Sequence, residues 1–237
     1  MFLRIAVIAT QRTIIFTQSD IEKMIKKHSV LLGITISLIL LTIAISIYPG
    51  GTYQDKNSIG FDWTKNYISN LFEAKALNGS QNTSRIWAYF GMFVYSISCA
   101  IFFVNMSKKI PEKNFKNIIK YTGILIMPFT FLIITPLHDL MLNISNFLFW
   151  NCIVAITVFI FMTKLHFFKI YNIICLLIFF YAVYIHTSSN WDLLPIIQKV
   201  NTISSILLIL GLEYFTEKED FAHIKPRKQH TRQPTNR

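Results

Sequence analysis

Residues 29–48 read SVLLGITISLILLTIAISIY, a run of 20 residues without a charged side chain. A helix needs about 20 apolar residues to cross the ~30 Å hydrocarbon core of a bilayer. Similar runs recur along the chain, and none shows the strict apolar–polar alternation of a membrane β-strand. This stretch therefore predicts a transmembrane helix, and the chain as a whole an all-α membrane protein.

Five further runs of this kind extend the prediction to a bundle of six transmembrane helices. We place the spans at residues 29–48, 86–106, 119–137, 144–163, 168–187 and 196–215. The third span carries Pro128 near its middle, and the sixth has Lys199 and Asn201 close to its start. The composition agrees, because 15% of the residues are charged, whereas soluble proteins carry about a quarter.

The basic residues fall mainly on one side of this predicted bundle. Of the 23 lysines and arginines, 18 lie in the terminal segments and in the loops on the same side. Cytoplasmic segments carry such an excess, so we expect both termini in the cytoplasm and residues 49–85 outside. The predicted location is a cell membrane, inner or plasma, crossed several times. Topology thus explains the net charge of +11, and we expect no nucleic-acid partner.

The chain divides into an N-terminal cytoplasmic segment (1–28), a membrane domain (29–215) and a basic tail (216–237) that is expected to be disordered. Residues 1–23 allow two interpretations. Met24 precedes Lys26 and Lys27, a natural cytoplasmic flank, so residues 1–23 could be an artefact of the chosen start codon. Alternatively, they form a helix at the membrane interface.

The long outer loop, residues 49–85, is rich in apolar anchors. Pro49-Gly50-Gly51 predicts a turn at the end of the first span. The stretch that follows predicts a short amphipathic helix with Trp63, Tyr67 and Leu71 on one face, packed as a cap on the outer ends of the spans. A loose hairpin is the alternative. The expected binding or structural residues of this cap are Asp62, Trp63, Asn66, Tyr67 and Asn70.

Several short motifs in this loop carry a resemblance. They are Tyr48-Pro49-Gly50-Gly51, Gly60-Phe61-Asp62-Trp63, Asn66-Tyr67 and Asn78-Gly79. In these the chain resembles an uncharacterised bacterial family of six-span membrane proteins, a domain of unknown function. That family is similar to the autophagy-modulator and Sfk-type membrane proteins, and the resemblance implies a role in lipid organisation. The chain departs from the family pattern at Asn70 and Asn151, which weakens a catalytic role for the motif.

Four titratable residues on the outer side are the candidates for chemistry. They are His138, Asp139, His186 and Asp192, at the ends of the third and fifth spans and in the turn after the fifth. Two histidines and two carboxylates at one depth could hold a zinc ion with an open position. However, the chain lacks HExxH, a nucleophile elbow and a phosphate-binding glycine loop. We therefore expect no metal and no cofactor.

The three cysteines, Cys99, Cys152 and Cys175, lie within apolar runs and are expected to be packing residues. Taken together, the sequence favours a non-catalytic membrane protein that binds lipid, a membrane protein partner or a second copy of itself through its outer face. The alternative is a membrane-embedded, metal-dependent lipid hydrolase.

Overall fold

The computed structural model describes residues 18–188 and 191–224. Within these ranges the chain is helical, with two isolated β-bridges and no β-strand. Six helices of 18 to 25 residues form the body of the protein: α2 (Ser29–Ser46), α3 (Arg85–Lys109), α4 (Lys113–Leu132), α5 (His138–Phe161), α6 (His166–Thr187) and α7 (Leu194–Phe215).

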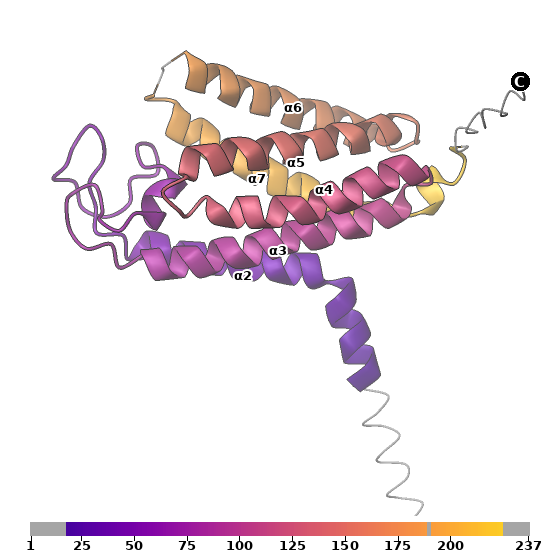
Figure 1. Cartoon of the computed structure of the whole chain (residues 1–237), viewed down its shortest axis with the longest axis horizontal. Helices are drawn as coiled ribbons and strands as arrows, with labels where there is room; N and C mark the ends of the chain where they lie inside the picture. The colour runs from indigo at the N-terminus through magenta and orange to yellow at the C-terminus, as the bar shows by residue number, and fades with distance from the viewer. Residues whose placement is uncertain (1–17, 189–190, 225–237) are drawn as a thin grey trace, which may run out of the picture.

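The six helices run side by side, with the long loop at one end of the bundle and both ends of the described chain at the other (Figure 1). From α3 onward, each helix is joined to the next by a short connection, so consecutive helices are antiparallel. A further helical segment, residues 18–27, precedes α2 and points away from the bundle (Figure 1). Two short 3-10 helices, η1 (Ile68–Phe72) and η2 (Glu219–Phe221), lie outside the long helices.

Helix α3 packs against α2, α4 and α7. Small residues let these helices approach closely: a Cβ on Gly33 of α2 would lie 2.0 Å from the hydroxyl of Ser98, and one on Gly123 of α4 would lie 2.2 Å from Phe103. Ser37 of α2 donates a buried hydrogen bond of 2.8 Å to the carbonyl of Gly91 in α3. Small and hydroxyl-bearing residues serve the same purpose between helices in membranes.

Five of the helices are long and apolar enough to cross a membrane, namely α2, α3, α5, α6 and α7. Much of their apolar surface faces outward. Helix α2 has a mean hydropathy of 2.4, yet only 22% of its residues are buried within the protein. Leaving such a surface in water would be unfavourable by about 25 cal/mol for each Å² of apolar area. The fold is therefore that of a multi-pass membrane protein.

The remaining long helix, α4, differs from the predicted third span. It begins at Lys113, six residues before the predicted start, and ends at Leu132 rather than at residue 137. Its first turns thus carry Lys113, Lys116 and Lys120, and its apolar part is shorter. The early end has a local cause: Pro136 disfavours helix at Thr135, whose hydroxyl instead donates to the carbonyl of Leu132 at 2.7 Å.

Helix α5 also begins earlier than predicted, at His138 rather than at residue 144. The predicted starts and ends of the other four spans lie within three residues of the helix bounds. Pro128 lies inside α4, as predicted.

The prediction of a disordered tail is wrong for its first part. Phe221 in η2 is fully buried in the main hydrophobic core, and His223 lies 2.7 Å from the carbonyl of Met162. The ammonium group of Lys109 also reaches the tail, with a hydrogen bond of 3.2 Å to the hydroxyl of Thr216. Burial of the Phe221 ring and these polar contacts together hold this segment against the bundle. Residues 225–237 and residues 1–17 of the N-terminal segment lie outside the described residues.

Candidate functional site at the loop end of the bundle

The loop between α2 and α3 is organised by asparagine side chains that bond its backbone. Asn66 is fully buried; its amide nitrogen donates to the carbonyl of Gly51 at 2.8 Å, and its oxygen accepts from the backbone N–H of Asp62 at 2.8 Å. Asn82 donates to the carbonyls of Asn70, Leu71 and Glu73 at 3.1, 3.2 and 2.8 Å. These bonds satisfy buried backbone groups that no helix or sheet pairs.

The two glycines of the Tyr48-Pro49-Gly50-Gly51 motif lie where the loop crosses itself. Both have a positive φ, +126° at Gly50 and +87° at Gly51. A Cβ on Gly51 would lie 2.2 Å from the backbone nitrogen of Asn78, and one on Gly50 would lie 2.3 Å from the carbonyl oxygen of Ser58. Only glycine permits this backbone conformation together with so close an approach. The motif therefore holds two parts of the loop against each other.

The predicted amphipathic helix in this loop is wrong. Residues 63–65 form a turn, the residues on either side of it are irregular, and the only helix in the loop is the five-residue η1. The physical reason is competition from side chains: the side-chain oxygen of Asn70 accepts the backbone N–H of Tyr67, which an α-helix would pair with the carbonyl of Trp63. As a consequence Leu71 is fully buried, whereas Trp63 remains 59% exposed. The two do not share a packed face.

Part of the loop nevertheless packs on the helices. Leu71 and Phe72 join a small hydrophobic cluster with residues of α2 and α3, including Ala44 and Ala88. Tyr48, at the end of α2, accepts a hydrogen bond of 3.2 Å from the backbone N–H of Leu77. This cluster fixes one side of the loop to the ends of these two helices.

Lys199 of α7 fixes the other side. Its side chain is buried, with 7% of its surface exposed, and its ammonium group donates to the carbonyls of Asn66 at 2.6 Å and Pro195 at 2.9 Å. The same ammonium lies 5.6 Å from the centre of the Phe61 ring, a cation–π contact. A buried ammonium needs such partners to offset its loss of hydration. Lys199 is thus the charged link between the loop and α7.

Three further hydrogen bonds connect the loop to the turn between α6 and α7 and to the start of α7. The backbone N–H of Ile68 donates to the side chain of Gln198 at 3.1 Å, and the hydroxyl of Tyr67 donates to the carbonyl of Trp191 at 3.3 Å. The side-chain amide of Gln54 donates to the carboxylate of Asp192 at 3.2 Å. Segments more than 120 positions apart in the sequence therefore form one surface, which we call the loop–α7 site (residues 48–84 with 191–199).

In the part of the loop between the two glycine turns, Asp62 and Tyr67 have perturbed pKa values. Hydrogen bonds to the carboxylate of Asp62, first from the hydroxyl of Thr64, lower its pKa below the usual value. Burial raises the pKa of the Tyr67 phenol. Asp62 is therefore a fixed carboxylate that orders the turn, and Tyr67 a neutral hydrogen-bond donor. Neither arrangement is that of a general base near neutral pH.

The four residues considered for catalysis do not form a metal site. His138 and Asp139 lie side by side, with the ring nitrogen 2.9 Å from the carboxylate, and Asp139 is almost fully exposed. His186 packs against the ring of Trp191, and Asp192 bonds Gln54. Over the described ranges, no group of three or more histidine, cysteine, aspartate or glutamate side chains could hold a metal ion. The geometry therefore gives the hydrolase alternative no support.

Lys199 is the functional residue whose role the sequence did not indicate. The sequence places it close to the start of the predicted sixth span, and it is the sixth residue of α7. A lysine within a helix that is otherwise apolar enough to span is costly, and that cost is the signal that it has a partner. Its partner is a loop carbonyl 133 positions away, which only the fold reveals.

The fold and this site define the chain as an all-helical, multi-pass membrane protein with an ordered loop at one end. No family model, curated protein or solved structure matches it. The assignment of function therefore depends on the physical properties of the loop–α7 site.

Proposed function

We propose that this protein is a non-catalytic, six-span membrane protein whose loop–α7 site contacts lipid at the outer face of the membrane. The observation that carries the proposal is the contrast within the loop. Its backbone is held by buried asparagines and by Lys199, yet it leaves large apolar side chains exposed: Ile59 at 95%, Tyr53 at 61% and Trp63 at 59%. An ordered frame that presents apolar side chains is typical of an interaction surface.

Lipid is the occupant that the chemistry of this surface favours. Tyr and Trp are the side chains that prefer the depth of the lipid headgroups, because one end of each ring system is apolar and the other forms hydrogen bonds. Trp191, in the turn next to the loop, is also exposed and accepts the bond from Tyr67. The loop motifs resemble an uncharacterised membrane family whose remote relatives are linked with lipid organisation, and this resemblance agrees with the proposal.

The proposal includes α4 as the sixth span. With 20 residues, α4 is about 30 Å long, and the turns that carry Lys113, Lys116 and Lys120 occupy part of this length. Its N-terminal lysines would lie at the cytoplasmic surface, where long basic side chains extend to the headgroups. With six spans, the loop and the two chain ends fall on opposite sides, which matches the excess of basic residues at the end away from the loop.

A lipid contact predicts how the fluorescence of Trp63 responds to quenchers. The emission of Trp63 is the difference between the emission of the wild type and that of the Trp63→Phe variant. In vesicles made with phospholipid brominated near the headgroup end of its acyl chains, this emission should be strongly quenched. Because Trp63 is largely exposed, this replacement should leave thermal stability in detergent unchanged within about 0.5 kcal/mol. If acrylamide in the water quenches this emission and brominated lipid does not, the side chain faces water and the proposal fails.

The six-span topology makes a second prediction. Single cysteines at Ser80 and at Lys218, in a background without the three native cysteines, should react with an impermeant maleimide from opposite sides of a sealed membrane. Ser80 lies in the loop and Lys218 follows α7. Labelling of both from the same side would contradict the odd number of spans, α3 to α7, that the proposal places between them.

A further inference from the structure

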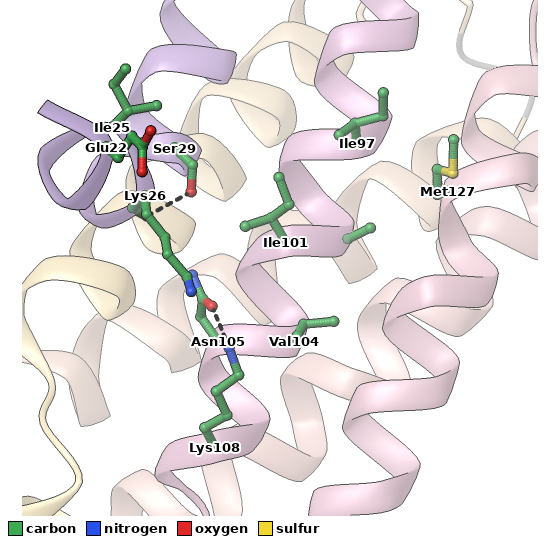
Figure 2. Close-up of a pocket in the computed structure, with 11 residues that line it drawn as sticks. Glu22, Ile25, Lys26, Ser29, Ile97, Ile101, Val104, Asn105, Lys108 and Met127 are labelled. Carbon is green, nitrogen blue, oxygen red and sulfur yellow. Dashed lines mark hydrogen bonds between the residues drawn. The ribbon is translucent and has the colours of Figure 1, made fainter. Parts of the chain in front are cut away.

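A groove lies at the end of the bundle opposite to the loop, between the helical segment 18–27 and helices α2, α3 and α4. Its volume is about 570 Å³, within the range of small-ligand sites. Residues on the segment and on the start of α2 form one wall and those on α3 the other, as Figure 2 shows. The lining residues that the argument uses are Glu22, Lys26, Ile97, Ile101, Asn105 and Lys108.

The polarity of the groove changes along α3. Ile97, Ile101, Asn105 and Lys108 follow one another at helical spacing on one face of α3, so the groove is apolar toward the middle of the bundle and polar toward its end (Figure 2). Ala100 and Met127 add to the apolar part. A phospholipid in the leaflet on the lysine-rich side of the membrane has the same order, with its acyl chains toward the middle of the bundle and its charged headgroup toward the end.

Two lysines at the polar end can bind a phosphate, and the neighbouring carboxylate of Glu213 accepts a hydrogen bond of 2.8 Å from the side-chain amide of Asn105. Lys108 donates to the side-chain oxygen of Asn105 at 3.2 Å, and Lys26 extends toward Asn105 from the opposite side (Figure 2). The one ion pair among the described residues is that of His138 and Asp139, so neither lysine is neutralised by a carboxylate within 4 Å. Glu22, which also lines the groove, lies away from Asn105 and Lys108 (Figure 2) and can accept a hydrogen bond from headgroup hydroxyls.

We propose that this groove binds one glycerophospholipid from the cytoplasmic leaflet, with its phosphate between Lys26 and Lys108 and one acyl chain along Ile101 and Ile97. Two flexible lysine side chains at the mouth of an apolar groove suit this ligand. Each ammonium group is a compact charge on a flexible stem, so it can adjust its position to pair with the phosphate. The inference depends on the protein spanning the membrane with this end in the cytoplasm. It does not depend on lipid contact at the loop–α7 site.

The test is retention of phosphatidylglycerol by the full-length protein in detergent, measured by native mass spectrometry after supply of equal amounts of phosphatidylglycerol and phosphatidylcholine. The wild type should keep one phosphatidylglycerol. The Lys26→Ala/Lys108→Ala double variant should lose about tenfold or more in retention. The matched control, Lys113→Ala/Lys116→Ala, removes two exposed lysines from α4 at the same end of the bundle and should retain the lipid.

Two additional experiments distinguish binding of a whole phospholipid from binding of a phosphate alone. Ala100→Phe leaves both lysines in place but fills the apolar part of the groove, so it should also abolish retention, with a melting temperature checked in parallel. Glycerol 3-phosphate at millimolar concentration should not displace the lipid; displacement would show that a soluble phosphate suffices and would overturn the proposal. Equal loss in both lysine pairs, or loss in neither, would overturn it as well. Quenching of Trp63 by brominated lipid should be unchanged in the Lys26→Ala/Lys108→Ala variant, which distinguishes this site from the loop–α7 site.

Discussion

Replacement of Lys199 with methionine should lower the free energy of unfolding in detergent by about 2–3 kcal/mol, because a charged donor that bonds two carbonyls is lost. Methionine keeps most of the aliphatic stem, so the packing is largely preserved. The buried charge also disappears, and the gain in solvation partly offsets the loss of the two bonds. For a chain of this size the melting temperature should fall by roughly 5–10 °C.

The same replacement should release the loop from α7. The backbone carbonyl of Asn66 loses its charged partner, so amide hydrogens of residues 61–72 should exchange markedly faster, while those in the middle of α3 should not change. Lys65→Met is the matched control, because Lys65 is exposed in the same loop; it should alter neither stability nor exchange. Exchange in residues 61–72 that is equal in the wild type and the Lys199→Met variant would show that Lys199 does not hold the loop.

The helices of this protein could be read from the sequence because the thickness of a membrane sets the length of an apolar run. Helix α2 is an example: its uncharged run leaves few alternatives, and the observed end lies within two residues of the prediction. The end of α4 could not be placed in this way. It depends on Pro136 and on a side-chain bond of Thr135, and these affect the backbone without changing the hydropathy of the run.

The loop was harder to predict because its conformation depends on long-range bonds. Spacing of Trp63, Tyr67 and Leu71 by four residues indicated a helix, but the side-chain oxygen of Asn70 accepts the backbone N–H of Tyr67 instead. Apolar spacing cannot show this competition. The role of Lys199 also needs the fold, since its acceptor in the loop is brought to it only when α2, α3 and α7 have assembled.

The glycines of the loop provide a prediction with its own internal control. Gly51 and Gly79 have nearly equal φ values, +87° and +86°, but their surroundings differ. A Cβ on Gly51 would meet the backbone of Leu77 and Asn78, with the nearest atom at 2.2 Å, whereas a Cβ on Gly79 would meet nothing within 4 Å. Substitution of alanine at Gly79 therefore measures the backbone strain alone, which is about 1–2 kcal/mol for a left-handed residue.

Substitution of alanine at Gly51 adds the clash to this strain. The obstructing atoms belong to the backbone, so no side chain can rotate away, and the two parts of the loop must separate. Separation would break the hydrogen bond of 3.2 Å from the backbone N–H of Asn78 to Gly50 and the bond of 2.8 Å from Asn66 to Gly51. We expect Gly51→Ala to cost about 4 kcal/mol or more, at least twice the cost of Gly79→Ala, as for other severe backbone clashes.

Thermal unfolding of the two variants side by side in the same detergent provides the measurement. Gly51→Ala should also weaken the quenching of Trp63 by brominated lipid, because a loop that has separated no longer holds this side chain in place. Gly79→Ala should retain that quenching, since the strain at Gly79 is confined to the tip of its turn. Equal destabilisation by the two substitutions would mean that the loop does not cross itself at Gly51, and the ordered frame on which the proposed lipid contact depends would then be absent.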